Sequence, residues 1–554
     1  MKNLSTNVLV RIKAKLLRPA LLGKAGMILF FALLITILFI PIKSYFNFYD
    51  EGFAVTNATR LLNGEAPYRD FWAIYPPGQL YILAGVFKLF GVSLDASRVY
   101  DTLVRAVLVL GIFLVARKMT SRRYAYLVTF ALTLVLASQG FYSYAVYPAL
   151  AVSIYALYSA LQYAAKKTRR WLLATGAITG LACIIRWDIG LYVGFGLSAA
   201  FFIYQFYAGF REKTPLPRAA YSAVQVAVLP LVVTIGILLA GYGLVSLRSG
   251  LGYVWDQVFY FPATQLRAVR WLAYPDLLPP HISGLSDFWN IYARPMDWLR
   301  FYLPLAIYAF AWIYYIYALF VKRIMPGVHD FGIMAAALCG PFLFSQALSR
   351  YDYIHVLPAL IPAALVAAAL FPKLLAFPGY RLSKGLVYLL LPAVASVYIL
   401  GPLNTVLGSI DDYPWKKCRS QLARASCVPT NGNEEKAVRY IQAHTQENEP
   451  IFVGNQRHDI LFVNDAGFYY LAARPSATRY SELQPGVANT LPIQQEMAGE
   501  LETKQVKYLV LVDIWLSNEP NGSSKSTGVV FLDNYIRKNY TRVAGFGEYQ
   551  IWER

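Results

Sequence analysis

One stretch near the start of the chain, residues 28–52, reads ILFFALLITILFIPIKSYFNFYDEG. Its first part is apolar through Ile42, and together with the residues before it this part is long enough to cross a bilayer as a helix. Two adjacent carboxylates, Asp50 and Glu51, follow a few residues later. The whole chain has only 31 acidic residues against 51 basic ones. An acidic pair just beyond a predicted membrane span therefore calls for an explanation.

The composition predicts a polytopic α-helical membrane protein. The chain has 554 residues, of which 57% are hydrophobic and 15% charged, and its mean hydropathy is +0.42. Apolar runs of spanning length recur from Met27 to about Leu403 and then stop. We therefore expect a transmembrane catalytic domain over 1–403 and an extracytoplasmic α/β domain over 404–554.

The distribution of basic residues predicts the orientation of the spans. Although the formal net charge of +20 could suggest a nucleic-acid partner, much of it lies in short loops between apolar runs, which favours their placement in the cytoplasm. These loops are 117–123, 166–170, 211–218, 322–323 and the connection through Lys373, Arg381 and Lys384. They predict a cytoplasmic N-terminus, an uncleaved first span and about eleven helices, at 25–42, 98–117, 124–142, 147–165, 171–187, 189–210, 219–247, 299–321, 330–349, 354–371 and 385–403.

Two long loops, 43–97 and 248–298, are expected on the outer side. In the first, EGFAVTNATRLLNG has apolar residues at helical spacing and ends at Asn63-Gly64, which predicts a short helix along the membrane surface. Pro76-Pro77 forbids a helix across that junction but permits a new one to begin there. The second loop is rich in aromatic residues and contains Arg267 and Arg270.

The C-terminal segment alternates predicted helices and strands. Residues 433–444 and 491–504 have helical patterns, whereas 450–454 and 507–513 read as buried strands, which is typical of a small α/β domain. Cys418 and Cys427 are candidates for a disulfide in an oxidising compartment. The polar and aromatic residues of 454–459 and 462–483 could hold a glycan or cover an active site. They suit equally a domain that only docks on the membrane part, an interpretation we favour slightly.

The succession of residues in the first outer loop resembles that of GT-C glycosyltransferases. The branch with protein O-mannosyltransferases and the lipid A aminoarabinose transferase has Asp-Glu after the first helix, then a Lys-Pro-Pro-like motif, Phe-Gly and an Arg. The matching residues here are Asp50, Glu51, Pro76, Pro77, Phe90, Gly91 and Arg98. The resemblance is firm over about 20–120, weaker through the remaining helices and absent from the C-terminal segment. Tyr75 stands where the relatives often have the Lys, so a cation that contacts the donor must come from elsewhere.

The resemblance implies transfer of a sugar from a polyprenyl-phosphate donor to an acceptor hydroxyl on the outer face of the membrane. An acceptor hydroxyl is a poor nucleophile, so a carboxylate must remove its proton as it attacks the anomeric carbon. By the family pattern Asp50 is this general base, with inversion at the sugar, and Glu51 positions Asp50 or the acceptor.

Cations are needed to stabilise the departing lipid phosphate, and arginine suits phosphate because its planar fork donates two hydrogen bonds. RWDIG places Arg186 and Asp188, and SRYDYIHVLPAL places Arg350, Asp352 and His355, at outer ends of predicted spans. We predict that Arg350, His355 and Arg186 bind the donor phosphate. Further residues are expected to line the substrate cavity: Asp188, Asp352, Tyr75, Arg267 and Arg270. Arg98, Asp101 and Arg105 share a helical face and favour a structural ion-pair network.

Other functional classes are less well supported. The sequence has no Asp-x-Asp, GxGxxG, P-loop or zinc-like spacing, so no cofactor is required, although a divalent cation is possible. The main alternative is a transporter or flippase of lipid-linked sugar intermediates, which needs no base; a degenerate relative acting as a scaffold is another. We expect a multi-pass protein of the bacterial inner membrane. Its acceptor could be a glycan, a lipid or a protein, and the sugar and the oligomeric state stay open.

Overall fold

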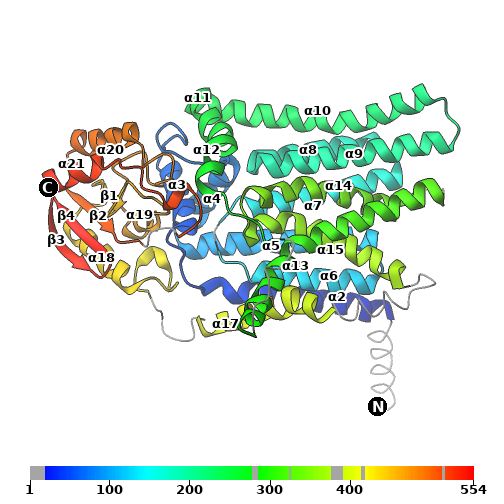
Figure 1. Ribbon diagram of the computed structural model, residues 1–554, viewed down its shortest axis with the longest axis horizontal. Coiled ribbons are helices and arrows are strands. Elements are labelled where there is room, and N and C mark those ends of the chain that lie inside the picture. Colours follow the sequence, from blue (N-terminus) through cyan, green and yellow to red (C-terminus); the bar gives the residue numbers. More distant parts are fainter. Residues whose placement is uncertain are drawn as a thin grey trace, which may run out of the picture.

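The computed structural model describes residues 19–554 apart from 142, 277–284, 323–325, 376–390, 413–417, 419 and 515–517. Part of the expected connection through Arg381 and Lys384, and the start of the expected span at 385–403, lie outside these residues. Figure 1 shows a long bundle of helices and, at one end of it, a smaller part that contains the strands. The C-terminus lies in this smaller part.

The bundle consists of long helices joined by short turns, as the apolar runs predicted. Its members are α2 (Pro19–Phe39), α5 (Leu94–Met119), α6 (Arg122–Ala137), α7 (Val146–Lys166), α8 (Arg169–Ile185), α9 (Trp187–Arg211), α10 (Leu216–Ser249), α13 (Leu285–Ile316), α14 (Val328–Ser349), α15 (Tyr353–Leu375) and α17 (Gly401–Gly408). Four short turns of 3₁₀- or π-helix extend three of them: η1 (Ile40–Lys43) follows α2, η3 (Tyr317–Val321) follows α13, and η4 (Ser396–Leu400) and η5 (Ser409–Asp412) flank α17.

Eight helices among the described residues are long and apolar enough to cross a membrane. The expected spans at 124–142, 147–165 and 171–187 form helices α6, α7 and α8, but these are not among the eight. Helices α6 and α8 have only 16 and 17 residues. Helix α7 packs against α5, α8, α9 and α14, and a helix enclosed by protein need not be apolar on every face. The count of eleven crossings therefore stays a prediction.

The RWDIG motif separates α8 from α9, where the sequence placed the break. Arg186 has an extended backbone (φ −154°, ψ 103°) between the two helices. Gly190 allows their close approach, because a Cβ atom there would lie 2.4 Å from the backbone nitrogen of Cys183. The turn consequently fixes Arg186 and Asp188 at one end of the bundle.

The two outer loops are largely helical. They contain α3 (Asp50–Leu62), α4 (Pro77–Phe90), α11 (Leu251–Val254), the π-helical turn η2 (Trp255–Tyr260) and α12 (Phe261–Arg270). Helix α3 ends at the predicted Asn63-Gly64, where Gly64 has a φ of +98°, and α4 begins at Pro77. The expectation that α3 lies along the membrane surface stays a prediction. Most of its side chains are buried, and it packs against α4 and the C-terminal segment.

The C-terminal segment builds a four-stranded sheet with helices around it. Its elements are η6 (Ala423–Ala425), α18 (Gly432–His444), β1 (Phe452–Asn455), α19 (Gly467–Ala472), α20 (Leu491–Thr503), β2 (Tyr508–Val512), η7 (Gly522–Ser524), α21 (Phe531–Asn539), β3 (Thr541–Phe546) and β4 (Tyr549–Glu553). The strand order is β1-β2-β4-β3, with β1 and β2 parallel and the other pairs antiparallel. In the centre Val510 pairs with Val453 on one side and Ile551 on the other. The two expected helices and two expected strands all form.

This segment is fastened to the start of α3 through two glycines. The Gly467 N–H donates to the Phe48 carbonyl at 2.7 Å, and a Cβ atom on Gly52 would lie 2.5 Å from the Gly467 nitrogen. The Thr56 hydroxyl donates to the Ala466 carbonyl at 2.9 Å. One hydrophobic core runs through the joint and includes Val55 of α3 together with Phe468 of α19. The start of α3 is thus placed by the C-terminal segment as well as by the first span.

A disulfide joins Cys418 and Cys427 in the connection between the bundle and α18. Cys183 and Cys339 are free thiols and lie buried in α8 and α14. The disulfide closes a short loop that leads into the sheet-containing part.

Candidate active site

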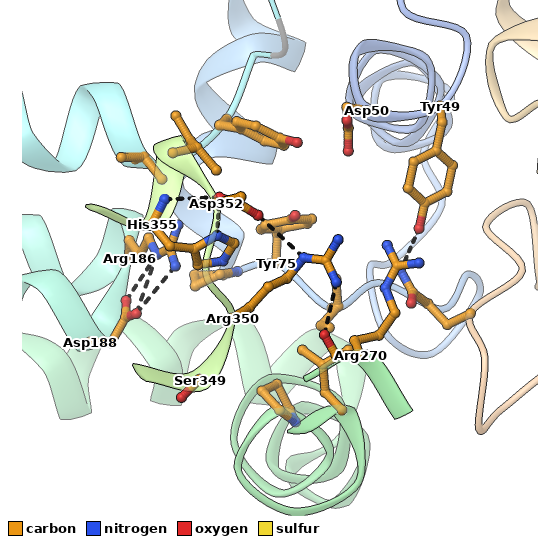
Figure 2. Close-up of a pocket in the computed structure, with 18 of the residues that line it drawn as sticks. Tyr49, Asp50, Tyr75, Arg186, Asp188, Arg270, Ser349, Arg350, Asp352 and His355 are labelled. Atoms are coloured by element: carbon orange, nitrogen blue, oxygen red, sulfur yellow. Dashed lines mark hydrogen bonds and ion pairs between the residues drawn. The ribbon is translucent and has the colours of Figure 1, made fainter. Parts of the chain in front are cut away.

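A cavity of about 580 Å³ lies where the bundle, the outer helices and the C-terminal segment meet. Its walls come from the start of α3, the residues before α4, the α8–α9 turn, α12, the α14–α15 turn and two C-terminal segments at Phe462–Val463 and Gln484. Figure 2 shows the polar side chains that converge on it. Nine residues chosen from the sequence line this cavity: Asp50, Tyr75, Arg186, Asp188, Arg267, Arg270, Arg350, Asp352 and His355.

Asp50 is the first residue of α3, and its half-buried carboxylate faces the cavity in Figure 2. The Asn47 side chain fixes the start of this helix, because its Oδ1 accepts hydrogen bonds from the N–H groups of Tyr49 (3.1 Å) and Asp50 (2.6 Å). Burial raises the pKa of Asp50 above its ordinary value, although a hydrogen bond from Tyr144 and the charge of Arg270 act in the opposite direction. A carboxylate made more basic in this way is suited to accept a proton.

Glu51 does not line the cavity, although the sequence placed it in the catalytic pair. It is fully buried in a bidentate ion pair with Arg98, in which Nε lies 2.8 Å from Oε1 and Nη2 lies 2.7 Å from Oε2. Adjacent residues on a helix point in directions about 100° apart, so the two carboxylates cannot both face one cavity. Glu51 anchors the first turn of α3 to α5, and its effect on Asp50 is through the position of that turn.

The predicted structural network on α5 forms around the same anchor. Arg105 pairs with Asp101 at 2.7 Å and donates to the carbonyl oxygens of Leu136 and Gly140. Arg98 also donates to the carbonyls of Ile42 and Ser44, in the residues that follow the first span. These contacts join α5 to the start of the first outer loop.

Arg186 and Asp188 form an ion pair on one side of the cavity. The Arg186 Nε lies 3.0 Å from Asp188 Oδ1, and Gln346 donates to Asp188 Oδ2 at 2.9 Å. Asp188 also accepts from the Ile189 N–H at the start of α9. Arg186 is therefore held at the cavity wall by a carboxylate that is itself fixed by the helix.

Arg350, Asp352 and His355 form a second charged group at the α14–α15 turn. Asp352 accepts from Arg350 Nε at 3.2 Å, and its Oδ1 lies 2.6 Å from His355 Nδ1. Burial acts to raise the pKa of Asp352, but the contacts with His355 and Arg350 outweigh it and bring the pKa below its ordinary value. The aspartate is thus an ionised bridge between Arg350 and His355.

Helix α12 brings Arg267 and Arg270 to the cavity from the second outer loop. Arg270 Nη1 donates to the Phe462 carbonyl at 2.8 Å, and its guanidinium lies 4.8 Å from the centre of the Phe462 ring. Figure 2 shows Arg270 on the same side of the cavity as Tyr49, opposite the Arg186–Asp188 pair. These two arginines supply cations to a cavity in which Tyr75 stands at the position of the expected Lys.

Tyr75 contributes an aromatic surface to the cavity. Its ring stacks on Phe53 with the centroids 5.0 Å apart and the planes 8° apart, and Tyr144 lies beside it at 6.2 Å. Its backbone carbonyl accepts from the Tyr68 hydroxyl at 2.8 Å, which fixes the turn before α4. Such a surface suits the apolar face of a sugar ring or a prenyl chain.

Two polar residues that line the cavity, Tyr49 and Gln484, were not predicted from the sequence, nor was Glu482, which contacts both of them. The Gln484 Nε2 group donates to the Tyr49 hydroxyl at 2.7 Å and to Glu482 Oε1, while Gln484 Oε1 and Glu482 Oε2 are buried without a hydrogen-bond partner among the described residues. Burial raises the pKa of Glu482 to about 7. Glu482 lies within the 462–483 stretch noted as suited to glycan binding. Its contact with Tyr49 could not be predicted from a local sequence pattern, because the two residues lie far apart in the sequence.

The cavity combines a basic carboxylate, several guanidinium groups and aromatic surface. Its lining includes four arginines (Arg186, Arg267, Arg270, Arg350) and three aspartates (Asp50, Asp188, Asp352). Such a set can bind an anionic group and accept a proton within the same enclosed volume. Among the described residues, no group of three or more His, Cys, Asp or Glu side chains is arranged to hold a metal ion.

Part of the chain matches a known protein family. Residues 75–237 match the family model described as dolichyl-phosphate-mannose-protein mannosyltransferase. Among curated proteins, none matches the chain by sequence.

Solved structures share the fold over nearly the whole chain. ArnT from Cupriavidus metallidurans bound to undecaprenyl phosphate superposes with a TM-score of 0.55 at 13% identity, covering 95% of this chain and 98% of that one. The apo form of ArnT superposes with a TM-score of 0.53 at 15% identity, covering 96% of this chain and 98% of that one. The archaeal oligosaccharyltransferase AglB from Archaeoglobus fulgidus was solved in complex with an inhibitory peptide and a dolichol-phosphate. It superposes with a TM-score of 0.50 at 13% identity, covering 88% of this chain and 70% of that one. This chain is therefore similar to GT-C membrane glycosyltransferases in sequence over residues 75–237 and in its fold.

Proposed function

We propose that this chain transfers a sugar from a polyprenyl-phosphate donor to an acceptor hydroxyl at the outer face of the membrane. The observation that carries the proposal is the cavity in which Asp50 faces several arginines. The comparison structures add support, since ArnT was solved with undecaprenyl phosphate and AglB with a dolichol-phosphate and a peptide.

In this mechanism Asp50 removes the proton of the acceptor hydroxyl as its oxygen attacks the anomeric carbon. The bond from that carbon to the donor phosphate oxygen breaks on the opposite side, which gives inversion. The arginines stabilise the charge that develops on the departing lipid phosphate. The raised pKa of Asp50 increases its proton affinity at the moment of attack.

Arg270 and Arg350 are the best placed cations for the phosphate, because both lie close enough to Asp50 to affect its pKa. Arg186 and His355 are held by Asp188 and Asp352 on the neighbouring wall, and we propose that they contact the donor from there. Tyr75, Asp188, Asp352 and Arg267 complete the lining. A divalent cation is not required by this scheme, and activity in the presence of EDTA tests that expectation.

The proposed orientation places the cavity and the C-terminal segment outside a bacterial inner membrane and the N-terminus in the cytoplasm. The basic connection between α9 and α10 lies at the end of the bundle opposite the sheet in Figure 1, as the positive-inside rule requires for this orientation. Cysteine labelling at positions 168 and 526 in intact cells, with a membrane-impermeant reagent, tests it. Labelling at 526 alone is the expected result.

The function is tested in cells that lack the gene by restoring either the original chain or Asp50→Asn. Mass spectrometry of lipids and glycans from the deleted strain identifies the missing product and hence the sugar and the acceptor. Under the proposal Asp50→Asn fails to restore this product although the protein accumulates normally. Asp256→Asn is the control, since Asp256 is exposed and lies outside the cavity lining. Restoration by Asp50→Asn would favour the transporter alternative, which needs no base.

A further inference from the structure

Arg350 is bound by a carboxylate from the C-terminal segment in the geometry that arginine uses for phosphate. Its Nη1 lies 3.0 Å from Glu519 Oε2 and its Nη2 lies 2.6 Å from Glu519 Oε1. The two side chains are only 20% and 18% exposed. A bidentate pair of this kind occupies the outer edge of the guanidinium, which is the edge that would bind two phosphate oxygens.

Two further N–H groups of Arg350 are also engaged. Nε donates to Asp352, and Nη1 donates in addition to the backbone carbonyl of Arg270 at 2.8 Å. Figure 2 shows the Arg350 guanidinium between Asp352 and Arg270. A phosphate can therefore gain a bidentate contact with the Nη1–Nη2 end of Arg350 only if Glu519 gives up its own, because the Nε side is held by Asp352.

Glu519 belongs to a short segment that rests on the end of α12. Asn521 Nδ2 donates to the Trp271 carbonyl at 3.0 Å and to Glu519 Oε2 at 2.9 Å. A Cβ atom on Gly522 would lie 3.1 Å from Val269 Cα, so the segment lies directly against α12. Glu519 thus holds Arg350 while its neighbours contact the helix that carries Arg267 and Arg270.

The Glu519 carboxylate lies close to solvent. Its neighbours Asn518 and Pro520 are exposed, so the segment lies at the surface. Burial acts to raise the pKa of Glu519, but the hydrogen bonds and charge of Arg350 outweigh it and the pKa lies below its ordinary value. The group is therefore an anion at neutral pH, and it can become hydrated when its partner is taken.

We propose that Glu519 is an internal competitor of the donor phosphate for Arg350 and that donor binding displaces it. This inference rests on the proposed function and adds a residue that sets donor affinity. A ligand that binds only the unpaired state of Arg350 has an apparent Kd raised in proportion to the rarity of that state. Removing the competitor should therefore strengthen binding, whereas removing a residue that merely orients Arg350 should weaken it.

The experiment measures binding of undecaprenyl phosphate to the purified full chain in nanodiscs. Glu519→Gln is expected to lower the Kd about tenfold, because it removes the charge and keeps the shape. Glu519→Asp, which shortens the side chain, is expected to lower it by a smaller factor and serves if the first variant does not fold. Glu435→Gln is the matched control, since Glu435 also pairs with an arginine (Arg439, 2.7 Å) at 16% exposure but lies on α18 and does not line the cavity. Its Kd should stay unchanged.

A double-mutant cycle makes the assignment specific. Arg350→Gln should weaken binding, and in that background Glu519→Gln should have no further effect. An unchanged or raised Kd for both Glu519 variants would overturn the competition. A normal Kd for Arg350→Gln would overturn it as well, because Arg350 would then not bind the phosphate. If the original chain itself does not bind undecaprenyl phosphate, the proposed function and this inference fall together.

Discussion

The two walls of the cavity hold their charges in different ways. The inner wall is made by Arg186, Asp188, Arg350, Asp352 and His355 at the ends of bundle helices. Its contacts join residues two or three positions apart, except that Arg350 also pairs with Glu519 of the C-terminal segment. The outer wall, made by Asp50, Arg267, Arg270 and Gln484, comes from α3, α12 and the C-terminal segment. Its contacts join residues hundreds of positions apart, such as Arg270 with Phe462 and Gln484 with Tyr49.

This difference predicts how substitutions at the cavity affect catalysis and stability. The Arg186–Asp188 pair on the inner wall is neutralised within the bundle, so it does not depend on the C-terminal segment. On the outer wall the Asp50 carboxylate and the Arg270 guanidinium have no ion-pair partner within 4 Å among the described residues. Groups that lack a charged partner are available to substrate. We therefore expect changes at Asp50 and Arg270 to lower catalysis with little loss of stability, and changes in the Arg186–Asp188 pair to lower stability as well.

The largest effect is expected for Asp50→Asn. Loss of a general base should lower kcat by about 10³-fold, within the range for such catalysis, while the thermal midpoint changes little because Asp50 is only half-buried. Single-turnover transfer by the purified chain, with the donor and acceptor identified from the deleted strain, measures this. A loss of less than fivefold would exclude Asp50 as the base.

The next effect contrasts the two walls directly. Arg270→Gln should lower kcat/KM by about 10²-fold through weaker stabilisation of the leaving phosphate, with a nearly unchanged thermal midpoint. Arg186→Gln leaves the Asp188 carboxylate without its cation, so it should lower the thermal midpoint by several degrees. Equal losses of stability in both variants would contradict the distinction between the walls.

A smaller effect is expected at the glycine contact that seats the outer wall. Gly52→Ala introduces a Cβ atom 2.5 Å from the Gly467 backbone nitrogen and should cost about 1–3 kcal/mol of stability. Gly85→Ala in α4 is the matched control, because nothing lies within 4 Å of its Cβ position. Thermal unfolding of both variants compares them. A Gly52→Ala protein as stable as Gly85→Ala would mean that the two segments can separate freely.

The smallest effect concerns pH and Glu482. Its pKa is raised from 4.5 to about 7 in the fold, so the folded chain holds this proton more tightly than the unfolded chain. The resulting stability is fully present below pH 4.5 and is lost as the pH rises through about 7. Glu482→Gln removes the ionisation. Between pH 5 and pH 8, the free energy of unfolding of this variant should therefore fall by about 1–3 kcal/mol less than that of the original chain. Glu435→Gln should keep the original pH dependence of the thermal midpoint, and identical profiles for all three proteins would contradict the assignment.

Much of the inner wall could be predicted from sequence because its signals are local. RWDIG and SRYDYIH each place a cation and an anion at the end of an apolar run, and the ends of spans on one side of a membrane lie at a common depth. The Asp50-Glu51 pair was found in the same way. Asp50 lines the cavity whereas Glu51 pairs with Arg98, because adjacent residues on a helix point in different directions. Two adjacent acids in a sequence do not show which of them faces the cavity.

The outer wall was predicted less completely because its partners are distant in sequence. Gln484 contacts Tyr49 across 435 positions, and on the inner wall the contact of Glu519 with Arg350 likewise spans 169. No periodicity or spacing links such residues, since packing of the C-terminal segment against α3 and α12 brings them together. The slight preference for a C-terminal domain that only docks is not supported by the lining, because Phe462, Val463 and Gln484 form part of the cavity.

The pairing of Gly52 with Gly467 has a consequence for exchanging parts between related enzymes. A hybrid that keeps α3 but takes its sheet from another protein needs a residue without a side chain opposite Gly52. Otherwise the borrowed part would stand off from α3 and open the cavity to solvent. A donor protein for such grafts should therefore be selected for this glycine before any likeness in its strands is considered.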